Sequence, residues 1–262
     1  MSLGGLGLSV SASLGSTATG AVGSPSLVDN RYSLLVDGSN DYVDLNSDHE
    51  AWLERAQKTF TCWIKNDGNT SEARIFNVGY NDSGSATGFA LGIDGSSLGG
   101  SMASNDNQPF VFLRTAAAGA IKLAFGDVMS TSTWYHLSIV QDGANDKAYC
   151  YQNGVLKATF HSTEDAPYNH DIGEVSQATN EDAKIGKHWH DSDSTYYDGH
   201  IDEIALWNKS LTADEILYIY NQASAGKVLD LSVNSLDYVS SSDLHAWWRC
   251  YDAQIYINGS EK

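Results

Sequence analysis

Two short segments of the chain carry side chains that could hold a divalent cation. Asp37, Asn40 and Asp41 share one tight turn, and Asp202 and Glu203 stand together much later in the chain. Calcium prefers six to eight hard oxygen ligands, which Asp and Asn turns supply as carboxylates and carbonyls. The five residues are therefore a candidate structural calcium site. The alternative is that the first three only form turns and that Asp202 and Glu203 are buried hydrogen-bond acceptors.

A second polar segment runs from residue 187 to residue 198 and mixes aromatic, acidic and imidazole side chains. Two histidines two positions apart could ligate zinc, but an extended loop does not guarantee a fourth ligand, which favours solvated histidines. Flat aromatic rings beside acidic acceptors could also bind a sugar, and the same rings suit protein contacts. The candidate ligand-binding residues of this loop are His188, Trp189, His190, Asp191, Asp193, Tyr196 and Tyr197.

The composition excludes several classes of partner. With 33 acidic and 15 basic side chains, the formal net charge is −18, so nucleic acid and anionic membranes should be repelled. No apolar run reaches the roughly 18 residues of a membrane span, so membrane insertion is not expected. The three cysteines are far apart, and Cys62 and Cys150 lie in strand-like runs where a buried free thiol is expected.

Short apolar runs separated by Gly, Asn and Asp dominate the chain from residue 32 onward, which predicts an all-β sandwich or barrel. The dipeptide Asn153-Gly154 predicts a tight β-hairpin. One helix is expected near the C-terminus. It should begin with a capping box from Thr212 to Glu215 and end at Gly226.

Three regions differ in composition. Residues 1–30 are a Gly/Ser-rich arm, which serves either as a flexible leader or as a docking arm. Residues 31–225 form the β-domain, and residues 226–262 are a tail expected to pack on the sandwich or on a partner. Trp247 and Trp248 in this tail would be an interaction site if exposed and ordinary core if buried.

The order of the β-type segments resembles the laminin-G-like jelly rolls of the concanavalin A-like lectin/glucanase superfamily. The matching pieces are LLVDGSNDYVDL, FTCWIK, GFALGID, WYHLSIVQDGANDKAYCYQNGVL and DGHIDEIALWNKSLTADEI, spread over about residues 32–222. The resemblance implies a two-sheet antiparallel jelly-roll sandwich with one short C-terminal helix. It also implies that the first and last strands pair, which would bring the two acidic turns together.

The same family resemblance leaves the function open, because its members include carbohydrate-binding modules, adhesion domains and virion components. The Gly/Ser-rich leader and the HAWWR tail look like those of tailed-virus structural proteins. The main expectation is therefore a non-enzymatic, homo-oligomeric structural protein of a virion. It would either decorate the capsid or associate with a fibre. The alternative is an adhesin that binds host surface glycans. Both place the protein on a virion surface or outside a cell.

Glycoside hydrolysis is a third alternative, because laminarinase-type enzymes share the superfamily fold. Their Glu-x-Asp-x-x-Glu cluster is missing from this sequence, as are the H-E-x-x-H, P-loop and G-x-G-x-x-G motifs. A retaining enzyme needs two carboxylates about 5–5.5 Å apart. Asp202 and Glu203 should point to opposite faces of a strand. No catalytic residue is therefore expected.

Overall fold

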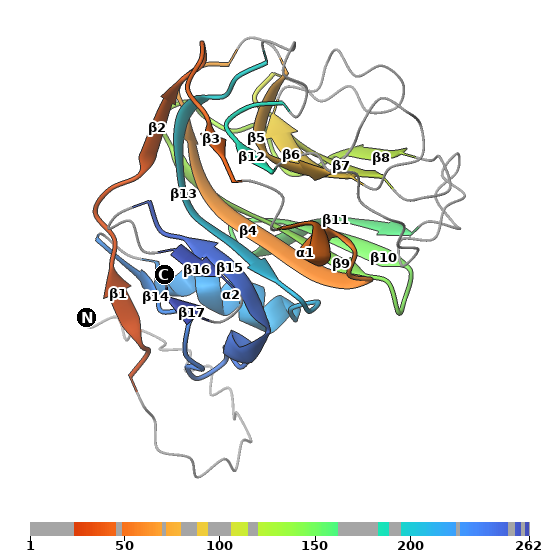
Figure 1. Ribbon diagram of the computed structural model, residues 1–262, viewed down its shortest axis with the longest axis vertical. Helices are drawn as coiled ribbons and strands as arrows, with labels where there is room; N and C mark the ends of the chain where they lie inside the picture. Colours follow the sequence, from red (N-terminus) through yellow and green to blue (C-terminus); the bar gives the residue numbers. More distant parts are fainter. Residues whose placement is uncertain are drawn as a thin grey trace, which may run out of the picture.

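The computed structural model describes residues 24–45, 49–69, 72–79, 88–93, 106–114, 120–161, 183–188, 195–223, 226–250, 255–257 and 260–261. Within these ranges the chain forms two large antiparallel sheets that lie face to face, together with a separate pair of strands (Figure 1). The predicted two-sheet, all-β fold is confirmed.

The larger sheet has nine strands among the described residues. Eight follow the order β11-β10-β9-β4-β13-β15-β16-β17, and β2 pairs separately with β13. Their bounds are β2 Leu34–Asp37, β4 Gln57–Asn66, β9 Trp134–Asp142, β10 Lys147–Gln152, β11 Val155–His161, β13 Asp198–Trp207, β15 Leu244–Trp248, β16 Ile255–Ile257 and β17 Ser260–Glu261.

The second sheet and the remaining elements complete the sandwich. In the order β3-β12-β5-β6-β7-β8, the six-stranded sheet contains β3 Val43–Asp44, β12 Lys184–Ile185, β5 Ala73–Gly79, β6 Gly88–Ile93, β7 Pro109–Arg114 and β8 Ala120–Ala124. The separate pair is β1 Leu27–Asp29 with β14 Lys227–Leu229, and the helices are α1 Glu50–Leu53, α2 Ala213–Gln222 and the 3-10 turn Ser241–Asp243.

Alternating side chains along β4 show how the sheet supports two separate apolar layers. Phe60, Cys62 and Ile64 are fully buried in the core between the two sheets. The intervening positions face the other side of the larger sheet, as the period of two requires. On that outer face a second apolar cluster, including Trp207 and Ile216, packs under α2, β14 and the segment that follows β14.

Several local expectations are confirmed. Asn153 and Gly154 both have positive φ and close the β10–β11 hairpin. Cys62 and Cys150 are buried free thiols. In α2 the Thr212 hydroxyl accepts a hydrogen bond from the Glu215 amide, and the Glu215 carboxylate accepts one from the Thr212 amide.

The helix ends earlier than expected, because Ala223 already has an extended backbone. Gly226, which was expected to end the helix, has positive φ just before β14. The helix therefore ends at Ala223 and not at a glycine cap.

The two terminal regions meet on the outer side of the larger sheet. The residues of β1 pair with those of β14, with Asp29 opposite Lys227. Further along the tail, β15 adds directly to β13, and both Trp247 and Trp248 are buried there. Of the predicted N-terminal arm, residues 1–23 lie outside the described residues.

Strand β13 is the central element of the larger sheet. One of its edges pairs with β4 throughout. Its other edge pairs first with β2, from Asp198 to Ile201, and then with β15, from Ile204 to Trp207. At the change of partner, the ladder with β4 is interrupted by a β-bulge. Within that bulge, Glu203 has a φ of 48°, a left-handed backbone that is rare for a residue other than glycine.

Replacing Gly199 with alanine should destabilise the fold strongly. Gly199 has a φ of 145°, and a Cβ there would lie 2.3 Å from the Lys65 carbonyl oxygen. Backbone strain costs about 1–3 kcal/mol, and displacing β4 should add about 1–3 kcal/mol. The matched control is Gly68→Ala, where φ is 131° but no atom lies within 4 Å. Denaturant unfolding should show the larger loss for Gly199→Ala. Equal losses would contradict the steric argument.

Candidate functional site

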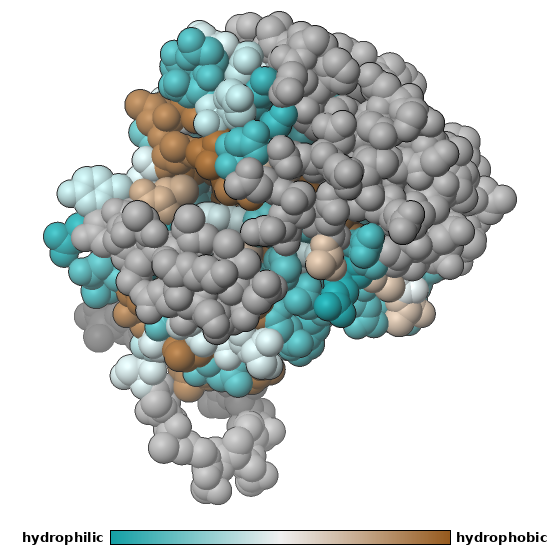
Figure 2. Space-filling view, in the orientation of Figure 1, coloured by the Kyte–Doolittle hydropathy of each residue, from teal (hydrophilic) through white to brown (hydrophobic). Residues whose placement is uncertain are grey.

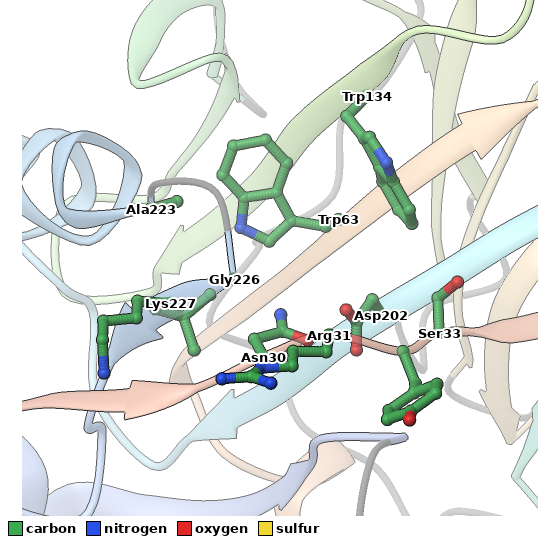
Figure 3. Close-up of a pocket in the computed structure, with 11 residues that line it drawn as sticks. Asn30, Arg31, Ser33, Trp63, Trp134, Asp202, Ala223, Gly226 and Lys227 are labelled. Carbon is green, nitrogen blue, oxygen red and sulfur yellow. The ribbon is translucent and has the colours of Figure 1, made fainter.

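A cleft of about 440 Å³ opens on the outer face of the larger sheet, beside the layer formed by α2 and β14. Its walls come from β4, β9 and β13 on one side and from the β1–β14 pair and the link to β2 on the other. Figure 3 shows Trp63 and Trp134 on one side of the cleft and Arg31 and Lys227 on the other. The lining side chains used below are Asn30, Arg31, Tyr32, Ser33, Trp63, Trp134, Asp202 and Lys227.

The two indoles stand on neighbouring strands. Trp134 pairs with Lys65 across the β4–β9 ladder, so it is a diagonal neighbour of Trp63 on the same face. The Trp63 ring stacks on Tyr220 of α2, with centroids 5.7 Å apart. The Lys65 ammonium lies 5.8 Å from the centre of the Trp134 ring. These contacts hold both indoles in place, while Trp134 remains 39% exposed. Flat, fixed and accessible rings can stack on an apolar face of a ligand.

Polar groups complete the cleft. The buried Asp202 carboxyl receives a hydrogen bond from the Asn30 side chain, yet its burial raises its pKa to about 7. Nearby, the Ser33 hydroxyl shares a 2.8 Å hydrogen bond with His200 Nδ1. Together with Arg31, these groups offer hydrogen-bond donors and acceptors beside the aromatic rings. Cavities with aromatic walls and a few placed polar groups are typical of sites for small ligands.

The bulge in β13 leaves both carboxyl side chains on the outer face, because Asp202 pairs with Trp63 just before it and Glu203 is turned outward within it. Asp202 lines the cleft, whereas Glu203 lies beneath it, against a cavity of about 10 Å³ that Trp63 and His136 also line. The expectation that the two side chains point to opposite faces is therefore wrong. A regular strand would separate them, but the bulge inserts one extra residue and cancels the alternation.

Glu203 is held by the C-terminal tail. The Trp247 Nε1 group donates a 2.6 Å hydrogen bond to Glu203 Oε2, and Arg249 Nε lies 3.8 Å from Oε1. The Arg249 guanidinium also lies 5.1 Å from the centre of the Trp247 ring. Trp247 is thus a buried support beneath the cleft, and Trp248 belongs to the core between the sheets. Neither indole is an exposed interaction site.

The five candidate calcium ligands do not come together. Within residues 31–225 the first strand, β2, pairs with the last, β13, as the family resemblance implied, but Asp37 faces Asp198 in that ladder. Asp202 is four residues further along β13, which corresponds to about 13 Å. Among the residues that the structure describes, no three His, Cys, Asp or Glu side chains group closely enough to hold a metal ion.

The first acidic turn has a local explanation. The Asp37 carboxylate accepts hydrogen bonds from the backbone amides of Ser39, at 2.9 Å, and Asn40, at 3.4 Å, and these bonds lower its pKa. Asn40 and Asp41 are exposed beside it. This is the geometry of an Asx turn, which needs no cation.

The predicted ligand-binding loop is described only in part. Trp189, His190, Asp191 and Asp193 lie outside the described residues. His188 is half-buried, and its amide hydrogen-bonds to the Thr195 carbonyl at 3.2 Å. Tyr196 packs near Tyr42, with ring centroids 6.4 Å apart. Tyr197 is 0% exposed in the core, so it is not the ligand-facing residue that the sequence suggested.

Sequence reasoning missed the cleft. The alternation in FTCWIK could have placed Trp63 on the face opposite Cys62, and the same pattern in β9 would have added Trp134. What no pattern revealed is that the link between β1 and β2 crosses beside both indoles. Asn30 and Arg31 were expected to lie at the boundary between the arm and the domain, without a role in a site.

A two-sheet sandwich with an aromatic, polar-rimmed cleft is an arrangement that can hold a small ligand. The chain belongs to the concanavalin A-like lectin/glucanase superfamily, because the Laminin_G_3 family model matches residues 37–217. The family resemblance seen in the sequence is thereby confirmed. No curated protein sequence matches the chain. Among the described residues, no helix has the length and apolar character needed to cross a membrane.

Solved structures share the fold at low sequence identity. The CBM40 module of a Ruminococcus gnavus sialidase, solved with α2,3-sialyllactose, matches with a TM-score of 0.54 and 14% identity, covering 74% of this chain and 97% of that one. A Bacteroides ovatus protein described as a candidate for carbohydrate binding matches with a TM-score of 0.58 and 13% identity. The match covers 91% of this chain and 55% of that one. Domain 4 of a Geobacillus stearothermophilus arabinanase, solved with arabinotriose, matches with a TM-score of 0.50 and 18% identity. The match covers 77% of this chain and 90% of that one.

The raised pKa of Asp202 predicts a pH-dependent stability. The carboxyl titrates near pH 3.8 when unfolded and near pH 7 when folded, so the folded state binds more protons between these values. Stability should therefore fall as pH rises from about 4 to 7, by up to a few kcal/mol. In urea unfolding from pH 4 to 8, Asp202→Asn should remove this part of the slope. An unchanged slope in the variant would contradict the assignment.

Proposed function

We propose that this protein binds a saccharide in the cleft between β4, β9 and the β1–β14 pair. The observation that carries the proposal is the placement of Trp63 and Trp134 on one wall, with Asn30, Arg31 and Asp202 within the same cleft. Sugar rings have an apolar face that can lie on an indole and an edge of hydroxyl groups that needs hydrogen-bond partners. The cleft offers both kinds of contact in one place.

The comparisons support this proposal in a general way. Two of the matched structures were solved with an oligosaccharide, sialyllactose in one case and arabinotriose in the other. At these identities the likeness shows the fold alone, so the location of the site and the identity of the sugar rest on the cleft itself. A fold of this kind can carry many unrelated sites.

We also propose that the cleft binds without cleaving. Asp202 is the one acidic side chain among the described residues that line it, whereas glycosidases ordinarily use two carboxylates. The neighbouring Glu203 carboxylate lies below the cleft, bound by Trp247. The sequence does contain one Gly-x-Ser-x-Gly spacing, at residues 95–99, outside the described residues. That motif works at a strand-to-helix turn of an α/β-hydrolase, which this all-β fold does not provide.

A role in virion assembly is the other proposal that the sequence suggests. The comparisons reported above include carbohydrate-binding modules, so they favour the glycan-binding alternative over a purely structural role. An adhesin that displays this cleft to host surface glycans, on a virion or outside a cell, would combine the two. Recognition of host glycans and the extracellular location are both part of the proposal.

Removing the exposed indole should weaken saccharide binding strongly. With a bound glycan identified on an array, Trp134→Ala should weaken binding at least about tenfold in calorimetry, since stacked area and a fixed ring are both lost. Trp63→Ala should act in the same direction, with unfolding measured in parallel because Trp63 also packs on Tyr220. The matched control is Tyr196→Ala in the 187–198 loop. Loss of binding in the control, with Trp134→Ala unaffected, would move the site to that loop.

The assembly role has a separate test. Light scattering coupled to size-exclusion chromatography should give the same subunit number for the full chain and for a chain that begins at Ser24. That shortened chain keeps β1, and with it every residue that lines the cleft. A full chain that forms oligomers and a shortened chain that is monomeric would instead support docking through residues 1–23.

A further inference from the structure

The mouth of the cleft differs in charge from the rest of the protein. The whole chain has a formal charge of −18. At the cleft, however, Arg31 and Lys227 stand on the same wall, and both lie near one carboxylate, that of Asp29. The Asp29 oxygens are 2.9 Å from Lys227 Nζ and 3.9 Å from an Arg31 Nη atom. Two cations that share one anion leave one net positive charge at this wall.

The fold holds this charge in place. Asp29 and Lys227 face each other in the β1–β14 ladder, and the buried Arg249 donates a hydrogen bond to the Asp29 carbonyl oxygen. Arg31 follows two residues after Asp29, where the chain leaves β1 toward β2. Both cationic side chains remain accessible, with 66% of the Arg31 side chain and 51% of the Lys227 side chain exposed. A ligand can therefore reach them without unfolding any element.

The far side of the cleft does not cancel this charge. The Lys65 ammonium lies 5.8 Å from the centre of the Trp134 ring, where it offsets the Asp67 carboxylate that lies 3.7 Å from His200 Nε2 beside the same ring. Burial raises the pKa of Asp202 to about 7, so its carboxyl is substantially protonated near neutral pH. A protonated carboxyl donates a hydrogen bond and does not repel an anion.

We infer that the cleft selects saccharides that carry an isolated carboxylate, which Arg31 and Lys227 bind while the sugar ring lies against Trp63 and Trp134. The inference rests on the proposed function, since it names the class of sugar for that same site. A planar carboxylate matches the paired donors of an arginine. The net charge of −18 repels polyanions, so a single acidic residue on an otherwise neutral glycan is the chemistry that fits.

The test uses the intact protein on an array that presents acidic glycans beside their carboxyl-reduced counterparts. The acidic member of a bound pair should bind at least about tenfold more tightly, and added salt should narrow that preference. Calorimetry on the same pair should show that Arg31→Gln and Lys227→Gln remove most of the preference, because each substitution weakens binding of the acidic glycan far more than binding of the reduced glycan. Asp29→Asn should raise the affinity for the acidic glycan, because it frees both cations.

Lys157→Gln is the matched control. Lys157 forms a similar ion pair with Asp127, at 2.6 Å, and does not line the cleft. Its loss should leave both affinities unchanged. Equal binding of the acidic and reduced glycans, or a preference for the reduced form, would overturn the inference while the saccharide-binding function stands. Binding of no glycan on the array would overturn the proposed function, and this inference with it.

Discussion

The left-handed backbone at Glu203 is the constraint on which the rest of the outer face depends. Such a conformation costs roughly 1–3 kcal/mol for a residue with a side chain, so surrounding contacts must hold it. Here Trp247 and Arg249 hold the Glu203 carboxylate from the C-terminal tail. The bulge that results marks the point where β13 exchanges β2 for β15, and it turns Glu203 to the same face as Asp202, which lines the cleft. One distorted residue thus links the sheet order, the docking of the tail and the site.

The cleft exists because the second apolar layer covers the larger sheet incompletely. The layer built on α2 and β14 stops at Trp63, which stacks on Tyr220 on the helix side and lines the cleft as well. Other apolar side chains are also exposed near this region, and Figure 2 shows an apolar area over β2, where Leu35 is 58% exposed. The cleft differs from such areas because its rings are fixed by neighbours and accompanied by buried polar groups.

Elements defined by local chemistry were predictable from the sequence. The Asn153-Gly154 turn, the capping box of α2 and the buried thiols all follow from residue types at short spacing, and the order of the β-type segments predicted the sandwich. The candidate calcium site depended instead on register, which spacing along the chain does not reveal: a four-residue offset separates Asp202 from the partner of Asp37. The outward position of Glu203 depended on a bulge at a non-glycine residue, and the cleft depended on a wall made by the first and last thirds of the chain. Neither has a local signature.

The pairing of β1 with β14 also sets an order of events during synthesis. Asp29 and Lys227 are 198 positions apart, so the wall that carries Arg31 cannot close until nearly the whole domain has emerged from the ribosome. At about 5–20 residues per second, the first strand waits roughly 10–40 s for its partner. During that interval Trp63, and Trp134 once it has been synthesised, lack the cover of the opposite wall. The nascent chain therefore exposes an aromatic surface that a chaperone could bind before the cleft exists.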